Sequence, residues 1–329
     1  MNAASSSDHY FDIYLAPLVP YLSRADVTDI FINRPGEVWI ETLAGHLTSH
    51  AVPELDEVML WRLARQIASF SHQGISREHP LLAATLPCGA RVQVVAPPAT
   101  RGPMAMAIRK HVVPDLSLAD YLDNGALEQI EFATRRSGAL SPAPVSDAPA
   151  AIADFLSEAV RARRNIIVSG GTSTGKTTFL NALLKEIPAH ERLVLIEDTP
   201  ELTVTHSNSV GMLAVRGDLG EARITMDDLM QASLRMRPDR IILGELRGHE
   251  AYSFLRAVNT GHPGSFTTIH ADTPEGALEQ LALIVLQSGT QMRREDIIRY
   301  AESVVDYVVQ LERKNGRRIV SRIMSTRAA

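Results

Sequence analysis

The stretch GGTSTGKTT at residues 170–178 constrains the fold of this 329-residue chain more than any other part of the sequence. It fits the pattern G-x-x-x-x-G-K-[ST], follows the strand-like run NIIVS (165–169) and precedes a segment with helical spacing. The residues at the fixed positions are Gly170, Gly175, Lys176 and Thr177. Glycines in such a loop let successive backbone N–H groups point at phosphate oxygens, and the positive end of the next helix faces the same anion. The stretch therefore predicts a phosphate-binding loop between a strand and a helix.

Each position of this loop has an expected contact with ATP and Mg²⁺. Lys176 is long enough to reach the β- and γ-phosphates, and the Thr177 hydroxyl is a ligand for Mg²⁺. The other contacts come from backbone N–H groups, which cradle the phosphates. We expect the nucleotide to contact Gly170, Gly171, Thr172, Ser173, Thr174, Gly175, Lys176, Thr177 and Thr178.

Strands and helices alternate from residue 151 onward. The apolar runs that read as strands are NIIVS, RLVLIED, RIILGE and SFTTI. Segments with helical spacing separate them, for example MDDLMQASLRM (226–236). Apolar strands joined by helices predict a mainly parallel sheet that is covered on both faces. We therefore expect an α/β nucleotide-binding domain over residues 151–329.

The first third of the chain predicts a second, smaller α/β domain. The run DVTDIFINRPGEVWIE (26–41) contains two β-rich stretches around a turn, and a helix is expected over 56–71. Residues 112–150 change character and include a Ser-, Pro- and Ala-rich stretch, which is a linker composition. The expected organisation is an N-terminal domain over 1–111, a linker over 112–150, and the nucleotide-binding domain after it.

Composition excludes several classes of protein. The chain carries 33 Lys and Arg against 38 Asp and Glu, and a formal net charge of −5 argues against broad electrostatic binding to nucleic acid. Its single cysteine, Cys88, excludes a disulfide within the chain and a Cys-based zinc site. The N-terminus lacks a signal-peptide pattern, and no segment reaches the roughly 20 apolar residues of a membrane span. We therefore expect a cytoplasmic protein without sequence-specific nucleic-acid binding.

Carboxylates end two further strand-like runs. Glu245 follows RIILG, so we expect it at the carboxyl edge of the sheet, where ligands bind in open α/β folds and where it would hold Mg²⁺ or a water. Glu197 and Asp198 end another run at the same edge; adjacent strand residues point to opposite faces, and we favour Glu197 as the one facing the nucleotide. A carboxylate here would position the water that attacks the γ-phosphorus and accept its proton. Whether Glu197 or Glu245 does so stays open.

The run GSFTTIHADT (264–273) places His270 at the end of one more strand of this sheet. Alone, a histidine in such a place is most often packed in the core. Beside a phosphate-binding loop and two carboxylates, its imidazole is suited to exchange hydrogen bonds with a phosphate oxygen. We therefore expect His270 to sense the γ-phosphate or to couple subunits.

Four of these stretches together resemble the secretion ATPase superfamily. GGTSTGKTT, IEDTPEL, LRMRPDRIILGELRG and GHPGSFTTIHADTPEGALEQL are similar to its nucleotide loop, acidic box, Walker B and histidine box. DVTDIFINRPGEVWIE and RVQVVAPP…AIRKH also resemble the N-terminal domain of the VirB11 branch of type IV secretion, so the resemblance covers most of the chain. The type II secretion ATPases carry a tetracysteine metal module, which one cysteine cannot build, and that branch is excluded.

The resemblance implies a RecA-like C-terminal domain and a hexameric ring with nucleotide between the two domains. It implies that Arg91 and Arg109 reach the nucleotide phosphates, and arginine suits this role because its planar fork binds phosphate bidentately. It also suggests an exchange of domains between neighbouring subunits through the linker. The candidates for an arginine that acts across a subunit boundary are Arg235, Arg237 and Arg240.

The function implied is that of a cytoplasmic hexameric ATPase, peripheral to the inner membrane, that energises substrate translocation or pilus assembly in type IV secretion. Its partners would be inner-membrane components of the secretion system and a secreted protein or DNA. Two alternatives remain: an ATP-binding switch that controls assembly, and a pilus retraction or extension motor of the same superfamily.

Overall fold

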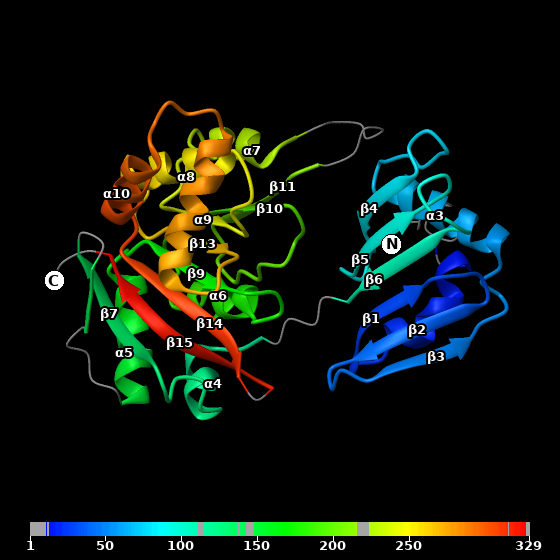
Figure 1. Cartoon of the computed structure of the whole chain (residues 1–329), viewed down its shortest axis with the longest axis horizontal. Coiled ribbons are helices and arrows are strands. Elements are labelled where there is room, and N and C mark those ends of the chain that lie inside the picture. Colours follow the sequence, from blue (N-terminus) through cyan, green and yellow to red (C-terminus); the bar gives the residue numbers. More distant parts are fainter. Residues whose placement is uncertain are drawn as a thin grey trace. The chain divides into compact units, whose positions relative to one another are not determined.

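The computed structural model describes residues 11, 13–110, 115–136, 139–142, 148–215, 224–314 and 316–326. The described chain divides into two compact units (Figure 1). The first consists of the residues before 113 together with Val215 and Ile224, and the second consists of the other described residues. Each unit has its own apolar core, so each is described separately.

The first unit contains a six-stranded antiparallel sheet in the order β3-β2-β1-β6-β5-β4. The strands are β1 (Val27–Ile32), β2 (Glu37–Thr42), β3 (Leu47–Ala51), β4 (Leu81–Thr85), β5 (Arg91–Val95) and β6 (Ala105–Arg109). The helical segments are η1 (Ala16–Leu18), α2 (Val19–Leu22) and α3 (Glu57–Phe70). Helix α3 begins where the Asp56 side chain accepts a 2.7 Å hydrogen bond from the Met59 backbone N–H, which satisfies a free donor of the first turn. Its buried face, which includes Leu60, Leu63 and Ile67, covers the sheet as the helical spacing predicts.

The second unit is built on a nine-stranded sheet in the order β11-β10-β12-β13-β9-β14-β15-β7-β8. The strands are β7 (Glu131–Arg136), β8 (Ala139–Pro142), β9 (Ile166–Gly170), β10 (Leu193–Glu197), β11 (Ser209–Leu213), β12 (Arg240–Leu243), β13 (Phe266–Ile269), β14 (Tyr307–Lys314) and β15 (Arg317–Ser325). Neighbouring strands pair in parallel except in the two hairpins β14–β15 and β7–β8. The prediction of a mainly parallel sheet is confirmed.

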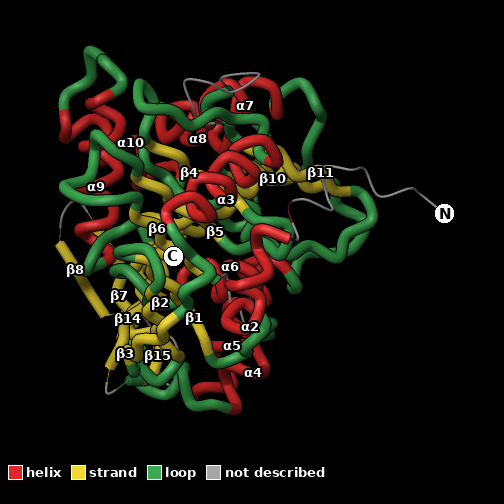
Figure 2. Tube along the Cα trace, turned by 90° about the vertical axis from the view of Figure 1, so that its right-hand side faces the viewer, coloured by secondary structure: helices red, strands yellow, loops and turns green. Residues whose placement is uncertain are grey.

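Helices cover both faces of this sheet. They are α4 (Leu118–Asp123), α5 (Pro149–Arg161), α6 (Lys176–Leu184), α7 (Met226–Ser233), α8 (Glu250–Asn259), α9 (Pro274–Gln287) and α10 (Arg294–Val304). One core cluster joins α7–α10 to the sheet, and the other joins α4–α6 to it. In Figure 2, α9 and α10 accordingly lie on one side of β14 and β15, and α5 and α6 lie on the other.

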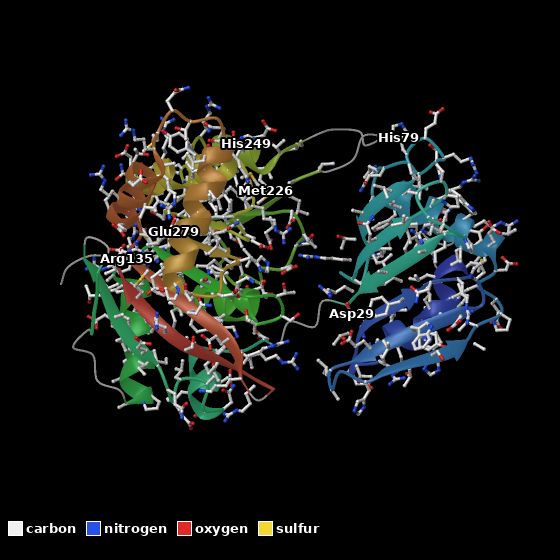
Figure 3. All side chains as sticks on the ribbon, in the orientation of Figure 1. Asp29, His79, Arg135, Met226, His249 and Glu279 are labelled. Atoms are coloured by element: carbon white, nitrogen blue, oxygen red, sulfur yellow. The ribbon has the colours of Figure 1, made fainter. Side chains whose placement is uncertain are left out.

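The structure differs from the predicted linker over 112–150. Part of this range forms α4 and β7, and β7 pairs in parallel with β15 of the nine-stranded sheet. Tyr121 is buried and packs edge-on against Phe179 of α6, with ring centroids 5.1 Å apart. Arg135 of β7, labelled in Figure 3, forms a 2.7 Å ion pair with Glu302 of α10. Apolar burial and strand pairing therefore place this segment in the second unit, although residues 112–114, 137–138 and 143–147 of the predicted linker lie outside the description.

A buried ion pair anchors the amino edge of the parallel strands. Arg240 begins β12 and is fully buried; it donates bidentately to Glu191, with distances of 2.6 Å from Nε and 2.9 Å from Nη2. Its Nη1 also donates to the Val160 carbonyl at 2.8 Å. Burial alone would raise the pKa of Glu191, but the hydrogen bonds and charge of Arg240 hold this pKa below its ordinary value. The pair ties β12 to the turn before β10 and to the end of α5.

Removing one member of this pair should strongly destabilise the second unit. We expect Arg240→Ala to lower the free energy of unfolding by about 3–5 kcal/mol, because Glu191 would stay buried without its main partner. Urea denaturation followed by circular dichroism measures the change. The double variant Arg240→Met, Glu191→Leu removes both charges and should recover most of the loss. A single variant that unfolds at the wild-type midpoint would contradict the anchoring role.

Candidate active site

The phosphate-binding loop connects β9 to α6 in a conformation that requires glycine at two positions. A Cβ on Gly170 would lie 2.5 Å from Oγ1 of Thr174 and 2.8 Å from the carbonyl oxygen of Leu311, so no side chain fits there. Gly175 precedes the first residue of α6 and has a φ of +91°, in the left-handed region that favours glycine. The loop thus has the strand–loop–helix arrangement that its sequence pattern predicts.

Lys176 is buried and directed back over the loop. Its Nζ donates to the carbonyl oxygens of Gly170 and Gly171, each at 2.9 Å, and lies 3.1 Å from Nδ1 of His270. Burial lowers the pKa of Lys176 to about 8, although the nearby charge of Glu245 opposes this shift. The ammonium therefore lies against the phosphate-binding loop. The loop carbonyl groups and the His270 ring that it contacts occupy the place where a bound phosphate would contact it.

His270 links Lys176 to the end of β12. Its Nε2 lies 2.9 Å from Oε1 of Glu245. An ammonium has only donors and a carboxylate only acceptors, so Nδ1 accepts from Lys176, and a proton on Nε2 gives the tautomer that suits the adjacent Glu245 carboxylate. Burial lowers the pKa of His270, in part opposed by Glu245. A neutral imidazole with its tautomer set by two neighbours is the state expected in this structure.

Two residues that the sequence analysis did not select extend this chain of contacts. Arg247 forms an ion pair with Glu245 through Nη2 and donates from Nη1 to Asp198 at 2.7 Å. Asp198 is therefore held by an arginine that follows the next strand of the sheet, and this arginine contacts Oε2 of Glu245 while His270 lies next to Oε1. The only sequence signal for Arg247 was its position two residues after Glu245.

The acidic box brings a third carboxylate to the loop. Oε1 of Glu197 accepts hydrogen bonds from the backbone N–H groups of Glu201 and Leu202, at 2.7 Å and 2.8 Å. Glu201 in turn accepts a 3.0 Å hydrogen bond from Oγ1 of Thr177. Glu197 was expected to face the nucleotide, and in the structure one of its oxygens organises the turn that carries Glu201. Glu201 was not predicted as a site residue, although EDTPEL places it only four residues after Glu197.

The side-chain oxygens of Thr177 and Glu201 are suitable ligands for a magnesium ion whose other ligands come mainly from the nucleotide and water. No cluster of three His, Cys, Asp or Glu side chains that could hold a metal ion occurs in the described part of the chain. Mg²⁺ usually keeps several waters and takes only one or two carboxylates plus substrate phosphates. The Thr177 hydroxyl and the Glu201 carboxylate, already within hydrogen-bond distance of each other, offer such a set, and the charge of Glu245 also acts on the adjacent Lys176.

The arginines that were expected to act on the nucleotide fall into three groups. Arg91 and Arg109 lie directly opposite each other on β5 and β6 of the first unit, and Nε of Arg109 donates at 2.8 Å to Asp29, which is labelled in Figure 3. Arg235 and Arg237 are exposed in the segment between α7 and β12. Arg240 is fully buried against Glu191, so it is removed from the candidates for an arginine acting across a subunit boundary.

Comparisons with known proteins match nearly the whole chain. The sequence model of the family described as "Type II/IV secretion system protein" matches residues 14–315. The chain is 39% identical to the type IV secretion system protein VirB11 of Bartonella quintana, over 94% of this chain and 91% of the relative. It is 40% identical to the type IV secretion system protein PtlH of Bordetella pertussis, over 96% of this chain and 94% of the relative.

Solved structures give the same result. The VirB11 ATPase from the Brucella suis type IV secretion system, crystallised in complex with sulphate, matches 96% of this chain and 97% of its own, with a TM-score of 0.50 and 37% identity. The pilus retraction motor PilT with bound ADP matches 97% of this chain and 83% of its own, with a TM-score of 0.62. At 17% identity the PilT match supports the fold alone. Among the described residues, no helix combines the length and the apolar character needed to cross a membrane.

Nucleotide binding should take up a proton near pH 8. With a pKa of about 8, roughly half of the Lys176 side chains are neutral at that pH, and the charge of a bound phosphate should restore the ammonium. We expect uptake of about half a proton per nucleotide at pH 8 and almost none at about pH 6.5. Calorimetric titration in buffers of different ionisation enthalpy measures this number. A Lys176→Arg variant, whose guanidinium stays charged, is the control, and equal uptake at both pH values would refute the assignment.

Proposed function

The chain belongs to the type II/IV secretion system protein family, and from this we propose that it works as a homohexameric, Mg²⁺-dependent ATPase that energises type IV secretion. It is an ATPase with a phosphate-binding loop, and its relatives are type IV secretion proteins. The observation that carries the mechanism is the contact chain from Lys176 through His270 to Glu245. It joins the loop to the residues that follow β13 and β12. A phosphate bound at Lys176 would therefore alter the contacts of both His270 and Glu245.

The reaction begins when the triphosphate replaces the partners of Lys176. The ammonium leaves the carbonyl oxygens of Gly170 and Gly171 and turns to the β- and γ-phosphates, which it neutralises. His270 loses its donor at Nδ1, and its ring is free to accept from a water or to reorient toward the γ-phosphate. Because His270 also contacts Glu245, nucleotide binding at Lys176 changes the surroundings of Glu245.

We propose that Glu245 positions the water that attacks the γ-phosphorus. Thr177 and Glu201 would bind Mg²⁺ or the waters of its coordination shell. One oxygen of Glu197 already accepts two backbone N–H groups, which suits a residue that shapes the turn, and we place its effect on catalysis in the positioning of Glu201. Glu245 stands beside His270 and Arg247, which hold its carboxylate in place to orient a water and take its proton. Mg²⁺, when bound, would draw charge from the phosphate oxygens and make the γ-phosphorus more electrophilic.

The remaining parts of the proposal concern assembly. Arg91 and Arg109 are cross-strand neighbours and would offer two guanidinium groups to the phosphates from the N-terminal domain. Arg235 and Arg237 are exposed and are the remaining candidates for an arginine that acts on the nucleotide of a neighbouring subunit. The ring would work at the cytoplasmic side of the inner membrane, together with membrane components of the secretion system and a protein or DNA substrate. In this proposal, closure of the N-terminal domain on ATP and its release after hydrolysis supply the motion.

Two variants separate an ATPase from an ATP-binding assembly switch. Lys176→Ala should lose nucleotide binding and hydrolysis, because the phosphate charge is no longer neutralised. Glu245→Gln should keep ATP binding and lower kcat about 10²–10³-fold, since its amide cannot accept the proton of the water. Phosphate release and nucleotide affinity measure the two effects. If Glu245→Gln abolished hydrolysis and left secretion intact, the switch would be the better description.

His270→Ala should keep ATP binding and lose most turnover. The substitution removes the imidazole that lies between Lys176 and Glu245 and leaves the loop sequence unchanged. We expect a decrease in kcat of about 10–10²-fold, with less than a threefold change in the Kd for ATP. His249, an exposed histidine next to α8, provides the matched control His249→Ala, which should behave as the wild type. Unchanged turnover in His270→Ala would return this histidine to a packing role.

A further inference from the structure

The hairpin formed by β14 and β15 carries basic residues near its tip that the site described above does not use. They are Arg313, Lys314, Arg317 and Arg318. In the antiparallel register Arg313 is directly opposite Arg318, and Lys314 is directly opposite Arg317. Opposed residues share a face of a hairpin and adjacent residues do not, so the four side chains divide into two pairs on opposite faces.

The pair Arg313 and Arg318 lies on the face that covers α6. Two residues farther from the hairpin tip on each strand, Leu311 and Val320 are also directly opposite each other, and both are buried in the core cluster that contains α6. Residues two apart on a strand point the same way. The two arginines therefore continue this face beyond the edge of the core, toward the first turn of α6.

Two observations place Arg318 beside the phosphate-binding loop itself. A Cβ on Gly175 would lie 3.1 Å from Cδ of Arg318 and 3.8 Å from its Nε, so the arginine stem passes along the last residue of the loop. The charge of Arg318 also acts on the hydroxyl of Tyr121, which packs against Phe179 of α6; burial raises the pKa of Tyr121, and Arg318 opposes this shift. Arg318 as a whole is exposed.

This arrangement lacks the negative charge that would balance it. Within the residues that the structure describes, no carboxylate forms an ion pair with Arg313 or Arg318. Like charges directly opposite each other on two strands are unfavourable, and the positive end of α6 adds to the same field. A bound anion would reduce the repulsion between the two arginines and would also balance the positive end of α6.

We propose that Arg318, with Arg313 beside it, binds the α- and β-phosphates of the nucleotide from the hairpin side of the loop. The inference rests on the proposed ATPase function for the identity of the anion. Lys176 and His270 stand at the γ-phosphate end, whereas the backbone N–H groups at the start of α6 face the phosphates that ATP and ADP share. Arg318 lies along Gly175, on this second side. It is a nucleotide-binding residue, and its contribution should be the same for ATP and ADP.

Nucleotide affinity of hairpin variants of the full-length chain tests this proposal. Arg318→Ala should raise the Kd for ADP and for ATP by about 10-fold or more each, since a charge-assisted hydrogen bond to phosphate is lost. KM for ATP should rise in parallel, with kcat changed less than about twofold, because the contact is equal in ground and transition states. Arg318→Lys should recover part of the affinity, because it restores the charge without the planar fork. Lys314→Ala, on the opposite face of the same hairpin, should bind as the wild type.

The outcomes separate this inference from the proposed function. Wild-type Kd values in Arg318→Ala, or equal weakening in Arg318→Ala and Lys314→Ala, would overturn the inference while ATP hydrolysis by the wild type stood. Weakened ATP binding with full ADP affinity would also overturn it, because it would place Arg318 at the γ-phosphate. A wild-type protein that bound ADP through Arg318 and did not hydrolyse ATP would instead remove the proposed function and keep the binding residue.

Discussion

The buried ammonium of Lys176 is the interaction from which the arrangement of the site follows. A charge out of water must be matched by acceptors, and this one has two loop carbonyl groups and one imidazole nitrogen. His270 is then fixed by Glu245, and Glu245 is held by Arg247, which also binds Asp198. The ends of β9, β10, β12 and β13 are thus connected through hydrogen bonds and ion pairs that start at one side chain. That side chain is the one a nucleotide would engage.

Much of this site was predictable because a parallel sheet brings the carboxyl ends of its strands to one edge. Apolar runs in the sequence mark the strands, and the polar residue that ends each run is therefore near the others. On that basis Lys176, Glu245 and His270 were expected together, and the structure brings them within hydrogen-bond distance. The mainly parallel sheet and helix α3 followed from the same patterns of spacing.

The rest depends on contacts that local sequence does not contain. Glu201 and Arg247 lie in turns after strands, and the turn conformation decides whether they reach the loop. Arg240 resembles its neighbours Arg235 and Arg237 in sequence, but only it begins a strand and enters the core. The supposed linker is ordered by a partner far along the chain: β7 pairs with β15, and Glu131 binds Arg322, 191 positions later. Residue composition predicts neither the turn conformations nor the pairing with a strand far along the chain.

The position of β14 in the sheet has a consequence for how the protein is made. Strand β9, which carries the loop, lies between β13 and β14, and Gly170 touches the backbone of Leu311 so closely that no Cβ fits between them. A ribosome therefore releases the loop residues long before one of their two neighbouring strands exists. Until residues 307–314 have emerged, the nascent chain has an open edge beside its phosphate-binding loop. The pairing on both sides of strand β9 is therefore completed late in synthesis.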